Sequence, residues 1–379
     1  MGPDVRISGH GTVVITLSNL TSGQSAALRG LITSSKEGAG PGPAPSFSPS
    51  ASPPDLVLSG SPDRLKRLIS AFSSAGGFPS DVAKKVDSLL DNHLRSDYKI
   101  DCRGTVLDLG LRTHIMGILN ATPDSFSDGG RFAAADRALA HAREMAAAGA
   151  DIIDIGGEST RPGAAPVTEE EELRRIIPLI ERLSAELTVP ISVDTYKSSV
   201  ARKSLEAGAS IVNDISGLRF SPDMAAVAAD FGAAVVIMHI KGTPRNMQQD
   251  PVYADVVAEV RAYLEEGIGI AVRAGVDRER IMVDPGIGFG KNLEHNLTIL
   301  GRLDEFKCLG RPIVLGTSRK KFIGTILDIP APEQRVDGTA ATVALGIERG
   351  AAIVRVHDVA RMAQVARMTD AILKSVQSS

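Results

Sequence analysis

The chain has 379 residues, of which 43% are hydrophobic and 23% charged, so it can bury a large core and form more than one domain. Its 42 Lys and Arg residues nearly balance its 45 Asp and Glu residues, giving a formal net charge of −3. Nucleic acids and anionic membranes bind basic surfaces, so neither is an expected partner. The expected partners are small molecules.

Two cysteines, Cys102 and Cys308, stand far apart with no CxxC pair, which predicts buried, reduced thiols. The first residues lack a basic segment followed by an apolar one, and no stretch approaches the roughly 18 apolar residues of a membrane span. We therefore expect a cytoplasmic protein.

Residues 1–97 are predicted to form a small α/β extension. Short strands are expected at 12–17 and 55–59, and helices at 25–34, 61–75 and 81–94. Between them, residues 38–54 are rich in Gly, Pro and Ser, so we expect a mobile linker or loop that is neither helix nor strand. No chemistry is evident in this extension, which is expected to stabilise the protein or contact a second copy.

From residue 98 onward the pattern changes. A hairpin is expected from strands at 98–102 and 105–109, followed by short apolar runs that alternate with amphipathic helices such as 133–148, 169–187 and 253–274. This alternation predicts a (β/α)8 TIM barrel over residues 98–379, with a doubly wound sheet as the alternative. The eight apolar runs are 114–119, 151–155, 190–193, 211–215, 234–238, 281–283, 312–315 and 353–356.

Polar residues follow nearly every one of these runs. In a barrel the carboxyl ends of all strands open on one face, so these side chains should converge there. Singly, an Asp could be a helix cap, an Asn a turn residue, and an Arg or His a surface partner. Their recurrence instead indicates a ligand with a hydrogen-bonding heterocycle and an anionic group. The strand-end groups are Asn120, 158–162, Asp194, Asn213 with Asp214, His239, Asp284 with 286–290, 318–320 and 355–357.

The segment 120–130, N-A-T-P-D-S-F-S-D-G-G, is longer than an ordinary βα turn requires and is interpreted as a binding loop. It resembles the first signature of the dihydropteroate synthase family, and residues 149–163, G-A-D-I-I-D-I-G-G-E-S-T-R-P-G, resemble the second. Residues 284–292, 317–322 and 353–358 are similar to later motifs of the same family. The resemblance covers residues 98–379 and leaves the extension outside.

This resemblance implies an enzyme of folate biosynthesis that condenses 6-hydroxymethyl-7,8-dihydropterin pyrophosphate with p-aminobenzoate, using Mg²⁺. It also implies a homodimer and inhibition by sulfonamides, which mimic p-aminobenzoate. Carried over by position, the pterin-binding residues would be Asp194, Asn213, Met238, Asp284, Lys320 and Arg355. The pyrophosphate would be bound by Asn120, Arg161, Arg355 and His357, with Asn120 also a metal ligand. The p-aminobenzoate slot would comprise Phe126, Thr160, Arg161, Pro162, Phe289 and Ser318.

Among these residues, Asp194, Lys320, Arg355 and Asn120 are the expected catalytic groups. The resemblance implies that pyrophosphate departs from the pterin methylene before the arylamine attacks, so no side-chain nucleophile is expected. Two alternatives remain open at this point. One is a pterin-binding methyltransferase that serves a corrinoid protein, and the other is a non-catalytic pterin-binding or scaffold protein.

Overall fold

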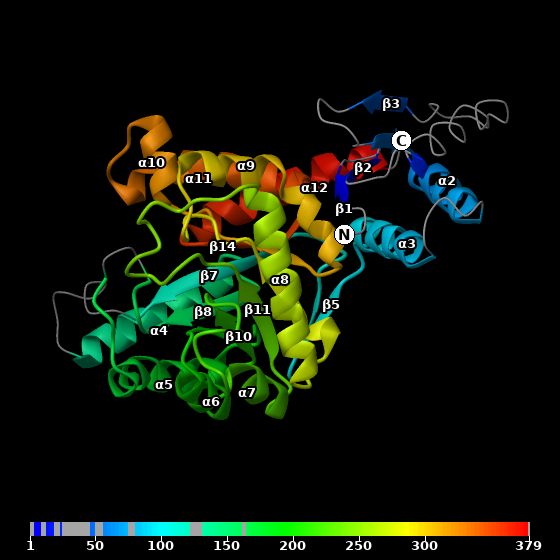
Figure 1. Cartoon of the computed structure of the whole chain (residues 1–379). Helices are drawn as coiled ribbons and strands as arrows, with labels where there is room; N and C mark the ends of the chain where they lie inside the picture. Colours follow the sequence, from blue (N-terminus) through cyan, green and yellow to red (C-terminus); the bar gives the residue numbers. More distant parts are fainter. Residues whose placement is uncertain are drawn as a thin grey trace. The chain divides into compact units, whose positions relative to one another are not determined.

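The computed structural model describes residues 4–8, 13–18, 23–24, 46–49, 56–74, 80–121, 131–160 and 164–377. The predicted helix at 25–34 and the site residues Phe126, Arg161 and Pro162 lie outside these ranges. The chain forms two compact units, Met1–Arg95 with Asp304–Gly310, and Ser96–Leu303 with Arg311–Ser379 (Figure 1). Among the helices that the structure describes, none has both the length and the apolar character needed to cross a membrane.

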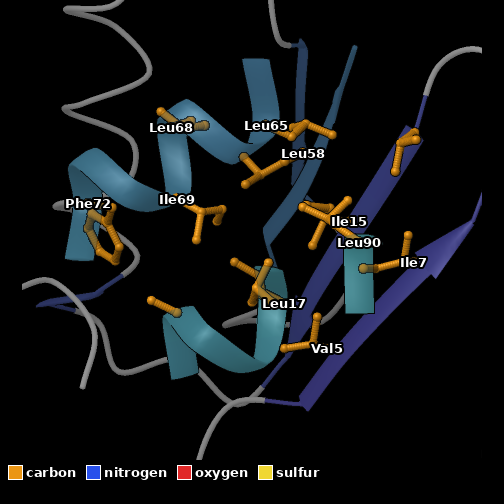
Figure 2. Packing of buried hydrophobic residues seen from close by; sticks show 13 residues of the cluster. Val5, Ile7, Ile15, Leu17, Leu58, Leu65, Leu68, Ile69, Phe72 and Leu90 are labelled. Carbon is orange, nitrogen blue, oxygen red and sulfur yellow. The ribbon is translucent and has the colours of Figure 1, made fainter. Parts of the chain in front are cut away.

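In the described part of the N-terminal unit, a four-stranded antiparallel sheet packs with two helices. The strand order is β1 (Asp4–Ser8), β2 (Val13–Ser18), β4 (Leu56–Gly60) and β3 (Ser46–Pro49), and the helices are α2 (Pro62–Ser74) and α3 (Ser80–Leu94). Every second residue of β2 is buried, as expected for a sheet with one covered face. Figure 2 shows Ile7, Ile15 and Leu17 of the sheet together with Ile69 and Phe72 of α2 in one apolar cluster.

Strand β3 corrects a prediction made from composition. Residues 38–54 were expected to form neither a helix nor a strand, yet Ser46–Pro49 pairs antiparallel with β4. A strand at the edge of a sheet bonds on one side only, so it tolerates proline and serine better than a central strand does. The prediction from composition was therefore wrong for β3, because a strand at the edge of a sheet needs few backbone donors.

The second unit is a closed barrel of eight parallel strands, as predicted (Figure 1). Strand burial is nearly complete, since each strand has helices outside it and packed side chains inside the barrel. The strands are β7 (His114–Asn120), β8 (Ile152–Gly156), β9 (Ile191–Asp194), β10 (Ile211–Asp214), β11 (Ala234–Met238), β12 (Ile281–Asp284), β13 (Ile313–Leu315) and β14 (Ala351–Val356).

Helices follow the barrel strands in sequence, and the described ranges also contain three short 3-10 helices, the second of which lies mostly in the N-terminal unit. The α-helices are α4 (Arg131–Ala147), α5 (Glu169–Glu186), α6 (Ser198–Glu206), α7 (Met224–Asp230), α8 (Val256–Arg273), α9 (Leu293–Gly301), α10 (Lys321–Leu327), α11 (Val336–Glu348) and α12 (Val359–Gln377). The 3-10 helices are η3 (Arg278–Arg280), η4 (Leu303–Leu309) and η5 (Pro332–Gln334).

A hairpin of β5 (Lys99–Cys102) and β6 (Thr105–Asp108) precedes the barrel. Its buried side chains Ile100, Cys102 and Leu107 pack in one cluster with residues at the beginnings of barrel strands, such as Ile152 and Ile211. The hairpin therefore covers the amino-terminal end of the barrel. The carboxyl ends of the strands form the opposite face, where a barrel carries its site.

Candidate active site

Arg355 of β14 lies between two carboxylates at the carboxyl end of the barrel. Its Nε donates to Asp154 Oδ2 at 2.6 Å, and one terminal nitrogen donates to Asp194 Oδ2 at 2.6 Å. Asn213 Nδ2 donates to the same Asp154 oxygen at 3.1 Å. Three residues predicted from separate strand ends are thus joined in one network.

Asp154 was not among the predicted site residues, although it is central to this network. It lies within the apolar strand β8, whose five residues are all buried, and its own side chain has no exposed surface. A charged residue inside an otherwise apolar strand was the available signal, because charges are rarely buried without a partner.

The two carboxylates retain acceptor capacity. Asp154 Oδ1 and Asp194 Oδ1 are buried and have no hydrogen-bond partner within the described ranges. Burial raises the pKa of Asp194 to about 7, with Asp154 adding to the increase and Arg355 opposing it. Burial disfavours a charged Arg355, but Asp154 and Asp194 outweigh it and raise the pKa of the guanidinium. The arrangement suits a ligand whose N–H groups can donate to both carboxylates.

Asp284, Lys320 and Phe289 form a second group beside the first. A Cβ placed on Gly316 would lie 3.8 Å from Asp284 Oδ2, 3.8 Å from Lys320 Nζ and 3.9 Å from Arg355 Cβ, so these side chains surround one point. Lys320 Nζ is 5.0 Å from the centroid of the Phe289 ring. Burial lowers the pKa of Lys320 to about 8 against the opposing effect of Asp284, whose own pKa burial raises.

The loop after β12 gives this second group its shape. Asp284 Oδ1 accepts from the backbone nitrogen of Gly286 at 2.7 Å, and the carbonyl of Ile287 accepts from Lys320 Nζ. Gly286 has a φ of +68°, and a Cβ there would lie 1.9 Å from the carbonyl oxygen of His239. Only glycine fits this position. Met238, which is buried and paired in register with Asp284, lies next to the same loop.

Asn120, Ser318 and His357 form a third group. A cavity of about 640 Å³ is lined by Asn120 and His357, with Arg137 of α4 and Arg361 of α12. The His357 backbone nitrogen donates to Ser318 Oγ at 3.1 Å, and His357 Nδ1 lies 3.0 Å from the same oxygen. Asn120 and His357 therefore border a space large enough for a small anion.

Other strand-end residues hold loops in place through fixed contacts, although Arg319 and Asp358 also line the cavity beside Asn120 and His357. Asp214 accepts from the backbone nitrogens of Ser216 at 2.7 Å and Leu218 at 2.9 Å, which fixes the turn after β10. Arg319 is held by Asp358 through two contacts of 2.9 and 2.6 Å. Glu158 forms a partly buried ion pair of 2.7 Å with Lys197.

Thr160 follows β8 and is partly buried. The other predicted slot residues of the first two loops, Phe126, Arg161 and Pro162, lie outside the described ranges.

Comparison with known proteins identifies the family of the chain. The family model described as pterin binding enzyme matches residues 116–357. The dihydropteroate synthase of Bacillus subtilis strain 168 is 53% identical over 274 residues, which is 72% of this chain and 93% of that protein. The chain belongs to the dihydropteroate synthase family. It is therefore an enzyme, a dihydropteroate synthase (EC 2.5.1.15) of folate biosynthesis.

Solved dihydropteroate synthases share the barrel. The Xanthomonas albilineans enzyme with 4-aminobenzoic acid is 45% identical, with a TM-score of 0.69, over 75% of this chain and all of that one (100%). The Yersinia pestis enzyme in a sulfonamide drug complex is 43% identical, with a TM-score of 0.69, over 73% of this chain and 99% of that one. These findings favour the synthase over the methyltransferase and the non-catalytic pterin-binding protein.

Proposed function

We propose that the first group of side chains, together with Asp284 and Lys320 of the second, binds the pterin of 6-hydroxymethyl-7,8-dihydropterin pyrophosphate. The observation that carries this proposal is the pair of buried Oδ1 atoms of Asp154 and Asp194, one on each side of Arg355. A pterin presents amino and ring N–H donors that would satisfy them. Asn213, Asp284, Lys320 and Met238 complete the proposed pocket, with Lys320 on the carbonyl side and Arg355 along the ring face.

In the proposed reaction, the bond between the pterin methylene and the pyrophosphate oxygen breaks, and its electron pair leaves with the pyrophosphate. The positive charge that develops on the methylene spreads into the pterin, where the carboxylate of Asp194 stabilises it. The amino nitrogen of p-aminobenzoate then forms the new C–N bond and loses a proton. The chain's own contribution is orientation and electrostatic stabilisation, without a covalent enzyme intermediate.

Asn120, Arg355 and His357, together with Arg161, are the proposed pyrophosphate-binding residues. Within the described ranges, no group of three or more His, Cys, Asp or Glu side chains could hold a metal ion. An amide oxygen such as that of Asn120 fits Mg²⁺, which commonly takes few protein ligands and completes its shell with phosphate oxygens and water. Mg²⁺ bound there would neutralise charge on the departing pyrophosphate.

The p-aminobenzoate slot is proposed to contain Phe289 and Ser318 beside Thr160, with Phe126, Arg161 and Pro162 from the first two loops. The bound 4-aminobenzoic acid of the Xanthomonas albilineans enzyme and the sulfonamide of the Yersinia pestis enzyme support such a slot. We propose that sulfonamides compete with p-aminobenzoate for this slot in the present enzyme as well.

We also propose that residues 98–379 act as the catalytic barrel of a homodimer, with residues 1–97 as an accessory extension. Support for the dimer comes from apolar side chains exposed on two adjacent helices, Leu345 of α11 and Met368 and Ile372 of α12, which are 42%, 63% and 53% exposed. The burial of both cysteines is consistent with a cytoplasmic location.

The proposed function is tested by incubating the purified chain with the pterin pyrophosphate, p-aminobenzoate and Mg²⁺, and identifying the product by mass. Formation of 7,8-dihydropteroate and pyrophosphate is expected. Formation of neither product by a folded chain would contradict the proposal. A methylated folate serves as the control substrate, since its turnover would indicate the methyltransferase instead.

A further inference from the structure

Lys291 is a buried lysine that the proposed function does not use. Its side chain is 2% exposed, and its Nζ lies 2.9 Å from Gly286 O, 3.0 Å from Phe289 O and 2.7 Å from His239 Nδ1. An ammonium has three N–H donors, which these three acceptors can satisfy. All three acceptors are uncharged, because burial and the neighbouring Lys291 lower the pKa of His239 to about 2. Burial lowers the pKa of Lys291 well below its usual value against the opposing effect of Asp284, so a lysine is costly at this position, which points to a specific role.

The two carbonyls belong to the glycine-rich loop after β12. Gly286, Gly288 and Gly290 have φ values of +68°, +84° and +62°, and the Phe289 backbone nitrogen donates to Gly286 O at 3.1 Å. A loop with so many glycines loses more conformational freedom on ordering than a loop of other residues. Lys291 joins the carbonyls at the two ends of this turn and so fixes it from the buried side.

The other side of the same turn supports the site. The carbonyl of Ile287 accepts from Lys320 Nζ, and the Phe289 ring lies 5.0 Å from that nitrogen. Both groups that contact Lys320 therefore belong to the turn at 286–289, whose two end carbonyls accept from Lys291. A rotation of this turn would displace Lys320 and the Phe289 ring together.

We propose that Lys291 is a positioning residue of the synthase reaction. It fixes the turn at 286–289 and, through that turn, the Lys320 ammonium and the Phe289 wall of the p-aminobenzoate slot. The inference rests on the proposed function for the identity of the substrates, but its structural part concerns the turn alone.

The test replaces Lys291 with Met, which has similar length and no donors, and with Gln, which retains two N–H donors. In K291M the KM for p-aminobenzoate is expected to rise about tenfold, with a smaller change in kcat. K291Q should recover part of this loss, because its amide can still donate to the two carbonyls. Lys307→Met is the matched control, since Lys307 is another lysine whose pKa burial lowers but which lies in the other unit. Its KM should stay within about twofold of wild type.

A folded K291M with an unchanged KM, or an equal rise in K307M, would overturn the proposal. If K291M does not fold, K291Q decides, and an unchanged KM in K291Q rejects the role. Hydrogen exchange of the amides at 286–290 gives a second measure that needs no substrate, and exchange about tenfold faster in K291M or K291Q is expected. If the wild type formed no dihydropteroate, the proposed function would fail while this second measure still decided whether Lys291 orders the turn.

Discussion

Asp194 contacts Arg355 at 2.6 Å and keeps a second oxygen without a hydrogen-bond partner among the described residues. Asp194→Asn preserves the shape of the side chain but removes the charge proposed to stabilise the pterin cation. We expect kcat to fall on the order of 10²-fold or more, while the protein keeps its fold. The matched control is Asp230→Asn, which removes one carboxylate from an exposed ion pair with Arg202. Equal turnover in Asp194→Asn and the wild type would reject the proposed role.

The pH dependence of kcat/KM follows from two shifted groups of the site. In the proposed mechanism Asp194 is ionised and Lys320 is protonated, and burial shifts the pKa of Asp194 to about 7 and that of Lys320 to about 8. The profile is therefore expected to be a narrow bell with its maximum between these values. Asp194→Asn should abolish the acid limb and leave the alkaline one. A profile that is flat from pH 6 to about 9 would contradict both assignments.

The same shift gives a prediction for stability. Burial raises the pKa of Asp194 from 3.8 to about 7, so the folded state binds this proton more tightly than the unfolded state. The free energy of unfolding contributed by Asp194 should therefore decrease as the pH rises from about 4 to about 7. Denaturation of the wild type and of Asp194→Asn between pH about 4 and about 7 measures this change in the free energy of unfolding. A difference between the two proteins that does not change with pH would contradict the shift.

Residues at strand ends were predictable because a barrel brings all of these ends to one face. Asn213, Asp284 and Arg355 were expected from that rule and lie in the networks described above. Asp154 was missed because it lies inside β8, two residues before the strand ends, where an inward-facing side chain is not distinguished by strand-end position. The rule also could not separate Asp214, which fixes a turn, from residues of the proposed site.

Among the structural elements, strands buried on both faces were the easiest to predict, because their apolar runs are continuous. The edge strand β3 could not be predicted in this way, since its pairing with β4 depends on the backbone and its sequence is that of a loop. The conformation of the loop after β12 was likewise not readable from its glycines alone. It depends on the approach of the His239 carbonyl and on the Lys291 ammonium, which come from packing.

Gly286→Ala tests how tightly this loop is packed. A Cβ at Gly286 would lie 1.9 Å from His239 O at a φ of +68°, so the backbone must move. We expect a loss of about 3 kcal/mol or more in the free energy of unfolding, together with weaker binding of p-aminobenzoate. Gly269→Ala in α8 is the control, because its Cβ would meet only the flexible end of Arg273, and a gain of about 0.5–1 kcal/mol is expected. Equal stability of the two variants in urea denaturation would contradict the packing argument.

At the scale of the whole molecule, the sequence predicted the function of the barrel but not that of the extension. Five family-like motifs identified the barrel, whereas residues 1–97 carry no chemical motif. The sequence did not indicate that a segment far along the chain belongs to the N-terminal unit. In the structure, Asp304–Gly310 is part of that unit. Within that unit, Asn92 Nδ2 donates to the carbonyl of Cys308 at 3.0 Å, and Phe306 is fully buried.

A chain that begins at Ser96 tests whether the extension contributes to activity or only to stability. It retains every described residue of the proposed site, so kcat should stay within about threefold of the full chain. Asn92→Ala in the full chain should lower the free energy of unfolding by about 1 kcal/mol, since it removes one hydrogen bond. Loss of the whole extension should lower the free energy of unfolding by more. Since each kcal/mol corresponds to about 2–4 °C, the Tm should then fall by several degrees. Calorimetry and the product assay measure both effects. A folded chain from Ser96 without activity would show that the extension completes the site, because the barrel would then contain the described residues of the proposed site and still not catalyse the reaction.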